Sequence, residues 1–219
     1  SLKDLERLRF ISPHPKDFKK DLANAFVELR TLCEHMHLPL QAGSNRILKK
    51  MRRFYTIETF FEKVNLLRDR LPDATLSTDL IVGFPGETDE EFEMTLEAVK
   101  KIRFDSIYSF KYSPRPKTPA AKYPEQIPEE IRSQRLKLLL EAQEKIVQEK
   151  NNALVGTNQE ILIEKKNAIK GRMVSGRSRG NHLVTIDNCE NEVGELIQVK
   201  ITEIHKNSIK AEPMSRFKL

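Results

Sequence analysis

The sequence predicts an α/β protein in which a parallel β-sheet covered by helices is followed by a long helix and a small all-β barrel. Three observations support this fold class. Short apolar strands alternate with helical periodicity in the first half of the chain, a proline-rich stretch then leads into one long amphipathic helix, and short alternating stretches between Gly, Asn and Lys turns follow. These changes of pattern predict an α/β body over residues 1–123, a linker helix over 124–153 and a β-barrel over 154–219.

Four short apolar segments are the predicted strands of the parallel sheet. They span residues 8–11, 36–40, 75–82 and 106–112, and helical periodicity follows each of the first three. Strands that alternate with helices indicate βαβ units. A closed barrel of such units has about eight strands in its familiar form, so we expect this sheet to have an open edge or missing members, and the chain to be a fragment.

Helices are predicted where apolar residues recur every three or four positions. Such periodicity covers residues 18–29, 47–51 and 60–71. After the third strand, Thr88 and Glu91 match a capping box, and the apolar residues behind them predict a well-defined helix start.

The linker helix is predicted over residues 129–151, with acidic residues in its first turn. Its apolar face is expected to be made by Ile131, Leu138, Ala142 and Ile146. The strands of the β-barrel are predicted at residues 160–163, 182–186, 197–204 and 208–211.

Composition places the chain among globular proteins. It has 219 residues, 38% of them hydrophobic, with a formal net charge of +6 and a mean hydropathy of −0.54, which permits an anionic partner but does not require one. No apolar run approaches the roughly 18–20 residues of a membrane helix and no signal-peptide pattern is present, so we expect a cytoplasmic protein without membrane contact. Cys33 and Cys189 stand far apart without metal-ligand spacing, so we predict neither a disulfide framework nor a metal site.

Polar residues follow the predicted strands at the edge where parallel sheets bind ligands. They lie within residues 12–15, 37–44, 79–87 and 112–115. Asp79 interrupts an otherwise apolar strand, and a buried carboxylate is costly unless it is paired, so Asp79 is either a satisfied structural group or a ligand contact. The turn after it contains Gly83, which allows the backbone to approach a ligand closely.

Three further side chains at this edge have both structural and ligand-binding interpretations. His37 is either a hydrogen-bonded strand histidine or a substrate contact, since no nucleophile or metal-spaced partner accompanies it. The amide of Gln41 suits a ribose, an amino or carboxyl group, or a backbone loop. Arg115 lies between two prolines, which would aim its guanidinium at a phosphate or carboxylate unless it is simply solvated.

Basic residues concentrate in one interval of the β-barrel that contains only Glu164 as an acid. Such a stripe on a small barrel fits contact with nucleic-acid phosphates, although few aromatic residues are interleaved for base stacking. Solubility alone is the alternative interpretation. The basic residues are Lys165, Lys166, Lys170, Arg172, Arg177 and Arg179.

Five segments together carry a resemblance to a known family. They read SPHP at residues 12–15, HLPLQAGS at 37–44, MRRFYT at 51–56, DLIVGFPGET at 79–88 and YSPRPKTPAA at 112–121. In this order they resemble the radical S-adenosylmethionine (SAM) methylthiotransferases, over essentially the whole chain. The resemblance implies the later part of a TIM-like radical SAM (βα) barrel, a linker helix and an OB-like TRAM β-barrel. Ala42 and Arg115 favour the branch that acts on isopentenyladenosine in tRNA, whereas Lys117 departs from the glycine usual at that loop position.

The resemblance also implies a function. A 2-methylthio group would be added to isopentenyladenosine next to the anticodon by radical chemistry that uses SAM and two [4Fe–4S] clusters. The cluster cysteines are expected before Ser1, so the chain alone is expected to be inactive. The expected partners are the anticodon stem-loop of tRNA and sulfur-donor and electron-donor proteins. Two alternatives stay open: the same chemistry on threonylcarbamoyladenosine of tRNA or on a ribosomal protein, and a non-catalytic TRAM-type RNA-binding protein.

Residue roles follow from the resemblance, position by position. The SAM site is expected to be lined by Ser12, Gln41, Asp79 and Gly83, with His37 and Arg115 near the substrate nucleotide. Contacts to tRNA phosphates are expected from Lys165, Lys166, Arg172, Arg177 and Arg179. No catalytic side chain and no metal ligand is predicted in this chain.

Overall fold

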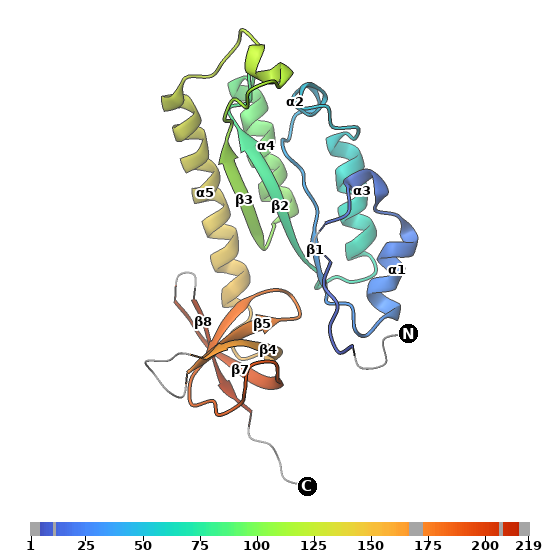
Figure 1. Ribbon diagram of the computed structural model, residues 1–219, viewed down its shortest axis with the longest axis vertical. Coiled ribbons are helices and arrows are strands. Elements are labelled where there is room, and N and C mark those ends of the chain that lie inside the picture. The colour runs from blue at the N-terminus through green and yellow to red at the C-terminus, as the bar shows by residue number, and fades with distance from the viewer. Residues whose placement is uncertain (1–4, 11, 167–172, 206–207, 215–219) are drawn as a thin grey trace. The chain divides into compact units, whose positions relative to one another are not determined.

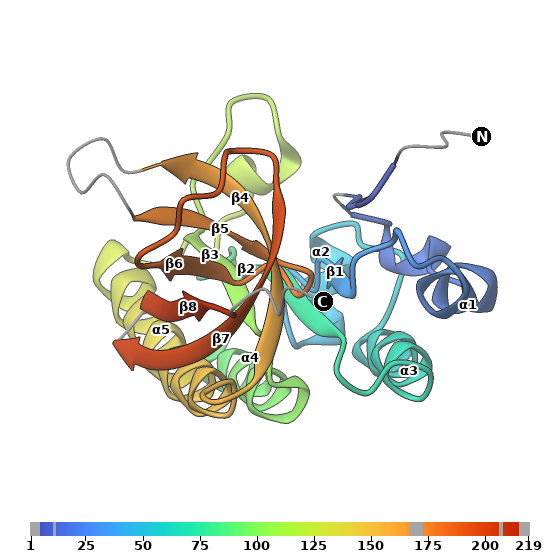
Figure 2. The same ribbon diagram turned by 90° about the horizontal axis from the view of Figure 1, so that it is seen from below.

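The computed structural model describes residues 5–10, 12–166, 173–205 and 208–214 of the chain (Figures 1 and 2). Contacts between residues divide the chain into two compact units, Ser1–Val147 and Gln148–Leu219. The first holds a parallel sheet with helices and the second a closed β-barrel, which confirms the predicted α/β fold with a β-barrel module. Within the described ranges, no helix is long and apolar enough to cross a membrane.

A parallel sheet of three strands is found among the described residues of the first unit. The strands are β1 (His35–His37), β2 (Thr75–Val82) and β3 (Ser106–Lys111), in the order β1-β2-β3. Helices alternate with them as predicted, and Figure 1 shows α4 behind β2 and β3. The helices are α1 (Lys20–Glu28), α2 (Asn45–Lys50), α3 (Ile57–Arg68) and α4 (Asp89–Ile102), with short 3-10 helices η1 (Pro15–Asp17) and η2 (Pro119–Lys122).

The predicted first strand, residues 8–11, is not formed in its described part. Leu8 makes a single bridge to Leu32, with its N–H donating to the carbonyl of Thr31 at 2.6 Å. The partner segment is a turn between α1 and β1 instead of a strand, so the ladder has only one rung.

The predicted second strand, residues 36–40, ends early at His37. Pro39 has no N–H to donate to a ladder, and the N–H of Leu40 donates to the Thr78 hydroxyl at 2.9 Å. Pairing with β2 resumes only at Gln41. The interruption leaves a stretch of irregular backbone beside β2, at the edge where ligands are expected.

The two faces of β2 differ in polarity, because side chains alternate along a strand. Leu76, Leu80 and Val82 are fully buried in the core that the helices share with the sheet. Ser77 and Asp79 lie on the opposite face, which carries the polar groups of the candidate site.

Glu91 ties the N-termini of α2 and α4 together. The predicted capping box is present, with Thr88 and Glu91 bonded reciprocally at the start of α4. Glu91 also accepts hydrogen bonds from Arg46 Nε at 2.8 Å and from Ser44 Oγ at 2.7 Å, while Ser44 accepts from the N–H of Ile47 and so caps α2. Burial opposes ionisation of Glu91, but the hydrogen bonds from Arg46, Thr88 and Ser44 outweigh it and lower the pKa of this carboxyl to about 2.

Helix α5 (Glu129–Asn152) agrees with the predicted linker helix in extent and in part of its buried face, because Ile146 is buried and Ala142 packs against the core as predicted. The prediction was wrong for Ile131 and Leu138, which are 38% and 42% exposed. The buried positions carry Leu139 and Ile146 together with two polar side chains, Arg135 and Gln143. Arg135 forms ion pairs with the α/β body, and Gln143 donates to a backbone carbonyl at 2.8 Å. A hydropathy pattern assigns both residues to the surface, because it does not register partners elsewhere in the chain.

The second unit is a closed barrel whose described strands run in the order β4-β5-β6-β8-β7. β6 and β8 pair in parallel and the other neighbours pair antiparallel. Apolar side chains such as Ile161, Val184 and Val199 fill its interior. The strands are β4 (Asn158–Lys166), β5 (Val174–Ser178), β6 (Leu183–Ile186), β7 (Leu196–His205) and β8 (Ser208–Pro213).

Strand β5 is the one barrel strand that was not predicted. Its sequence, VSGRS, has one apolar residue and no hydrophobic alternation. Gly176 is needed there because β4 comes close, and a Cβ at this position would lie 2.0 Å from the carbonyl oxygen of Leu162.

We expect Glu91→Gln to lower the stability of the first unit at pH 7 by about 1.5–3 kcal/mol, because charged hydrogen bonds to Arg46 and Ser44 are lost. The folded pKa of about 2 lies below the ordinary value of 4.5, so this stabilisation is present above pH 4.5 and is lost as pH falls towards 2. The difference between the two proteins should therefore shrink as the solution is acidified.

Urea unfolding followed by tyrosine fluorescence measures this effect in the first unit alone, since the chain has 4 tyrosines and no tryptophan. All of these tyrosines lie in the first unit, as Tyr55, Tyr108, Tyr112 and Tyr123. Glu93→Gln on the same helix removes only an exposed carboxylate paired with Lys100 and is the matched control. A difference that stays constant between pH 7 and pH 3 would contradict the role of Glu91.

Candidate cofactor and substrate site

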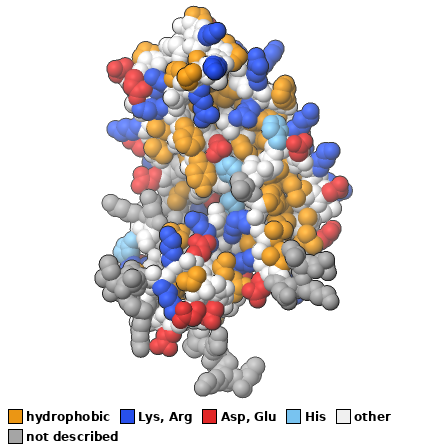
Figure 3. All heavy atoms as spheres, in the orientation of Figure 1, with side chains coloured by type: hydrophobic (Ala, Val, Ile, Leu, Met, Phe, Trp, Pro, Cys, Tyr) orange, Lys and Arg blue, Asp and Glu red, His pale blue; other side chains and the backbone are white. Residues whose placement is uncertain are grey.

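A cavity of about 550 Å³ opens at the carboxyl end of the sheet in the first unit. Its wall combines residues from the segments that follow β1, β2 and β3, at the edge where the sequence predicted a site. Figure 3 shows histidine, acidic and hydrophobic side chains next to one another on the face of this unit, with many Lys and Arg side chains towards the top of the view. The lining includes Gln41, Arg53, Asp79, Phe84, Tyr112 and Arg115.

Asp79 lies in the middle of β2, opposite Tyr108 of β3, and lines the cavity. Its side chain is 34% exposed, and its Oδ2 lies 3.4 Å from His37 Nε2. His37 in turn contacts the hydroxyl of Ser77 through Nδ1 at 2.9 Å. The structure therefore brings two predicted site residues, Asp79 and His37, into contact, and it pairs the carboxylate while leaving part of it accessible.

Gln41 is held at the cavity wall by its backbone. It has a φ of 73°, its N–H donates to the carbonyl of Asp79 at 2.8 Å, and its carbonyl accepts from the N–H of Ile81 at 2.9 Å. These bonds fix the segment after β1 to β2. The buried Gln41 side chain is thereby positioned among the lining residues, next to Asp79 in the fold.

The lining also contains Arg53 and Tyr112, to which the sequence assigned no role, although Tyr112 lies in the predicted polar cluster of residues 112–115. Arg53 Nε and the Tyr112 hydroxyl are buried and have no hydrogen-bond partner among the described residues. A buried polar group without a partner is costly, so two of them in one cavity wall indicate a ligand with complementary polar groups. Both lie in the segments MRRFYT and YSPRPKTPAA, and that placement is the sequence signal that points to them.

The charges around the cavity also act on Tyr55, whose hydroxyl donates to the carbonyls of Pro39 at 2.8 Å and Leu40 at 3.2 Å. Burial raises the pKa of Tyr55 to about 12, the positive charge of Arg53 opposes that rise, and the negative charge of Asp79 adds to it. Tyr55 therefore stays a neutral hydrogen-bond donor that fixes the irregular backbone ahead of Gln41. The charges of Arg53 and Asp79 on the cavity wall therefore both act on the phenol of Tyr55.

The turn after β2 brings bare backbone to this edge of the sheet. Gly83 and Gly86 have φ angles of 70° and 79°, a conformation that favours glycine. Glu87 is buried, and its Oε2 accepts from the N–H of Gly83 at 2.7 Å and from Arg135 at 2.8 Å. Arg135 also donates to Asp89 Oδ1 at 2.7 Å. Burial raises the pKa of the Glu87 carboxyl, and the Gly83 N–H and Arg135 oppose that rise.

Arg132 supports the same edge from one helical turn earlier on α5. Its guanidinium donates to the carbonyl of Tyr112, and its aliphatic stem packs over Gly83. A Cβ at Gly83 would lie 2.3 Å from Arg132 Cγ, so glycine is required there by space as well as by φ. Gly83 itself is not among the lining residues; it holds the turn that carries the lining residue Phe84.

Arg115 and Ser12 differ in their relation to the cavity. Arg115 lines it, and its carbonyl accepts from the N–H of Thr118 at 3.2 Å and from the Thr118 hydroxyl at 2.8 Å. Ser12 is exposed, donates to the neighbouring carbonyl at 3.1 Å and is not among the lining residues. Its segment still lies beside the site, because His14 packs against Tyr55 with ring centroids 5.5 Å apart.

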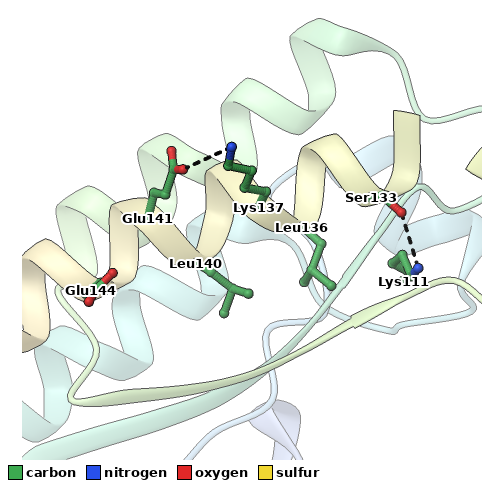
Figure 4. A pocket seen from close by; sticks show the side chains of 7 residues that line it. All are labelled: Lys111, Ser133, Leu136, Lys137, Leu140, Glu141 and Glu144. Carbon is green, nitrogen blue, oxygen red and sulfur yellow. Dashed lines mark hydrogen bonds and ion pairs between the residues drawn. The ribbon is translucent and has the colours of Figure 1, made fainter. Parts of the chain in front are cut away.

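Two other hollows in the described part of the first unit differ from this cavity. One of about 220 Å³ shares several lining residues with it and is bounded by the segment around η2. The other is a groove of about 290 Å³ between Lys111 of β3 and one side of α5 (Figure 4). Figure 4 shows Lys111 directed to Ser133 and Lys137 directed to Glu141, so both lysines of the groove are bonded to neighbouring side chains. The groove contains none of the residues predicted for a site.

The predicted RNA contacts at the end of β4 are accessible. Lys165 and Lys166 are both exposed, and Lys166 forms an ion pair with Glu192. Arg172 and the neighbouring Lys170 lie outside the described residues.

The predicted RNA contacts on and after β5 are partly exposed. Arg177 Nε lies 3.5 Å from a carboxylate oxygen of Glu164, and Arg177 donates to the carbonyl of Asn181 at 3.1 Å. Arg179 is half-buried. Acids from β4 and from the loop before β7 therefore neutralise part of the basic stripe, a feature that the linear sequence shows only for Glu164.

The two cysteines do not form a metal or cluster site. Cys33 and Cys189 are both buried, one in each unit. In the part of the chain that the structure describes, no group of three or more His, Cys, Asp or Glu side chains is arranged to hold a metal ion. Cysteine thiolates hold iron–sulfur clusters, so these described residues do not fit such a cluster.

Two family models match the chain, the radical SAM superfamily over residues 2–99 and the TRAM domain over residues 152–214. Curated relatives named tRNA-2-methylthio-N(6)-dimethylallyladenosine synthase are similar over most of it. The relative from Carboxydothermus hydrogenoformans is 46% identical over 199 residues, 91% of this chain and 45% of the relative. The relative from Thermodesulfovibrio yellowstonii is 44% identical over 218 residues, 98% of this chain and 49% of the relative. The chain spans about half the length of the curated relatives it matches.

A solved structure supports the fold independently. Coproporphyrinogen III oxidase (HemN) from Escherichia coli, described as a radical SAM enzyme, matches with a TM-score of 0.52 over 80% of this chain and 50% of that chain. The sequences are 14% identical, so the likeness concerns the fold alone.

Replacing Arg135 with Met should destabilise the first unit by about 3–5 kcal/mol, because it leaves the buried carboxylate of Glu87 without its cation. Urea unfolding followed by tyrosine fluorescence is again the measurement. Lys137→Met, on the exposed side of the same helix, is the matched control and should change stability by less than about 0.5 kcal/mol. Equal stabilities of these two variants would show that the ion pair does not hold α5 to the turn.

Proposed function

We propose that the chain belongs to the radical SAM superfamily, carries a TRAM domain and forms the SAM-binding and RNA-binding parts of a tRNA methylthiotransferase. The proposed reaction adds a 2-methylthio group to isopentenyladenosine next to the anticodon. The observation that carries this proposal is the identity of 42–46% to named synthases over 90–98% of this chain. The anticodon stem-loop, sulfur-donor and electron-donor proteins as partners, and a cytoplasmic location, belong to the same proposal.

The cavity of the first unit is the proposed SAM site. We propose that Asp79 accepts hydrogen bonds from the ribose hydroxyls and that Gln41 bonds to the same part of the cofactor. The guanidinium of Arg53, whose buried Nε lacks a hydrogen-bond partner among the described residues, is proposed to pair with the carboxylate of the methionine moiety. Ser12 flanks this site, and Gly83 shapes the turn that closes it. When bound, SAM supplies the radical and methyl-donating chemistry.

Iron–sulfur clusters are proposed to be bound only by a longer protein that contains this chain. The described cysteines do not fit a cluster, and the relatives are about twice as long as this chain. We propose that two [4Fe–4S] clusters are held outside the two units described here. The contribution of this chain is to bind SAM, position it and hold the RNA.

The target nucleotide is proposed to enter beside the SAM site. An enzyme that modifies a base takes it out of the stack and reads it between aromatic or apolar side chains. Phe110 lines the cavity with its side chain 55% exposed and offers such a surface. Arg115, on the same wall, is proposed to contact the nucleotide phosphate. His37 is proposed to lie near the nucleotide and to act through its contact with Asp79.

The β-barrel is the proposed tRNA-holding module. The proposed bounds of the parts are 1–123, 124–153 and 154–219, and the TRAM match begins at residue 152, where α5 ends. Phosphate contacts are proposed for Lys165, Lys166, Arg172, Arg177 and Arg179.

Mass spectrometry of tRNA nucleosides tests the function. A strain of the source organism lacking the gene should lose 2-methylthio-isopentenyladenosine and accumulate isopentenyladenosine. Loss of 2-methylthio-threonylcarbamoyladenosine instead would show that the substrate is threonylcarbamoyladenosine of tRNA. Unchanged levels of both nucleosides would refute a tRNA methylthiotransferase.

Arg53→Met should weaken SAM binding about 10- to 100-fold, the range expected when a charge-assisted hydrogen bond is lost. Isothermal titration calorimetry with SAM measures the affinity. Arg52→Met is the matched control, because Arg52 does not line the main cavity, and its affinity should stay within about twofold of the unmodified protein. Equal affinities of the two variants for SAM would show that Arg53 does not contact the cofactor.

Replacing Arg177 and Arg179 with Ala should weaken tRNA binding and flatten its salt dependence, because each lost phosphate contact lowers the slope of log K against log salt by about 0.9. Filter binding at several salt concentrations gives that slope. Lys200→Ala, an exposed residue of β7 outside the basic stripe, is the control and should leave the slope unchanged. The same slope in the double variant and the unmodified protein would contradict the assignment.

A further inference from the structure

The polar face of the sheet carries a continuous chain of side-chain contacts through His35, Ser77, His37 and Asp79. The Ser77 hydroxyl lies 3.0 Å from His35 Nε2 and 2.9 Å from His37 Nδ1. His37 Nε2 lies 3.4 Å from Asp79 Oδ2. Parallel pairing of His37 with Ser77 and two-residue alternation along both strands place all four side chains on one face.

Donor and acceptor rules give the contacts among these four side chains one direction of hydrogen bonding when both imidazole rings are neutral. A carboxylate only accepts, so the Nε2–H tautomer of His37 is the one that turns a hydrogen towards Asp79. His37 Nδ1 is then an acceptor, and it receives the hydroxyl hydrogen of Ser77. The Ser77 oxygen in turn accepts from His35 Nε2. The opposite tautomer of His37 would direct a lone pair at the carboxylate.

Because Ser77 is buried, water cannot easily replace its hydroxyl in the contacts with His35 and His37. Ser77 is 2% exposed, whereas the side chains of His37 and Asp79 are 13% and 34% exposed. This series of contacts therefore leads from the protein interior to a carboxylate on the cavity wall. The ring of Tyr108 packs edge-on against His37, with centroids 5.7 Å apart, and supports the orientation of the imidazole.

We propose that Ser77 and His35 are positioning residues that hold His37 in its Nε2–H tautomer, so that His37 donates to Asp79 and fixes its carboxylate for a ligand in the cavity. The other lone pairs of the Asp79 carboxylate are acceptor sites, and these suit a ligand with hydroxyl donors such as a ribose diol. The ligand part of this inference rests on the proposed function. The tautomer part rests on the contacts of the described residues alone.

Ser77 is the residue whose substitution separates this role from simple packing. Alanine has no hydroxyl, so in Ser77→Ala nothing fixes Nδ1 of His37, and the ring is free to present either nitrogen to Asp79. Threonine keeps the hydroxyl and is well suited to a β-strand. Ser77→Thr should therefore restore the tautomer.

Nitrogen-15 NMR of the histidine side chains of the chain tests the tautomer at about pH 8.5, above the ordinary imidazole pKa of about 6.5. The chain has 5 histidines, and His37→Gln identifies the His37 signals by their loss. We expect the Nε2–H tautomer in the unmodified chain and in Ser77→Thr, and its loss in Ser77→Ala. The Nδ1–H tautomer in the unmodified chain would overturn the proposal even if the alanine variant failed to fold, as would an unchanged pattern in a folded Ser77→Ala.

Titration with SAM tests the consequence for the cavity. Ser77→Ala should bind SAM about 3- to 10-fold more weakly, the equivalent of one neutral hydrogen bond, and Ser77→Thr should bind within about twofold of the unmodified chain. Equal affinity in the alanine variant would overturn the positioning role. Absence of SAM binding by the unmodified chain would refute the proposed cofactor site, and the NMR result would still decide the tautomer.

Discussion

The buried contact between Glu87 and Arg135 is the interaction on which the cavity depends. Their side chains are 1% and 6% exposed, and a carboxylate so buried is stable only when its oxygens have strong donors. Glu87 finds these donors in the N–H of Gly83 and in a guanidinium 48 residues later in the sequence. One carboxylate therefore closes the turn after β2 and binds α5 to it.

The rest of the cavity wall is assembled around this contact. Arg132 extends from the same helix to the carbonyl of Tyr112 and so fixes the segment that follows β3. The N–H of Gly86 donates to the carbonyl of Glu125 at 2.7 Å, and the Glu125 side chain pairs with Lys50 at the end of α2. The segment after β3, the loop around Glu125 and the end of α2 are thus joined by polar contacts, directly or through α5, to the turn after β2, which explains how an irregular, proline-rich segment keeps a defined position.

Periodicity predicted the parts of the fold whose stability comes from apolar burial or local capping. The bounds of β2 and the capping box of α4 agree with the sequence, because Leu80 lies in a continuous apolar run and Thr88 bonds within its own helix turn. The polar residues on the buried face of α5 and the strand β5 are not predicted by periodicity. Arg135 is buried through partners far along the chain, and Gly176 is defined by the close approach of another strand, and neither cause leaves a periodic pattern. Arg53 has no such pattern either, and the feature that marks it as a site residue is a buried Nε without a hydrogen-bond partner among the described residues.

The two faces of β2 show why a carboxylate stands in the middle of this strand instead of at its end. On one face Leu76 and Leu80 supply the apolar contacts that hold the sheet to its helices. The other face is therefore free to be polar, and Ser77 and Asp79 use it to connect β1 with the cavity through His37. A carboxylate placed on a strand is held more rigidly than one in a loop, because the backbone on both sides of it is bonded in the ladder. The site thus combines a fixed acceptor on the strand with adaptable groups in the loops around it.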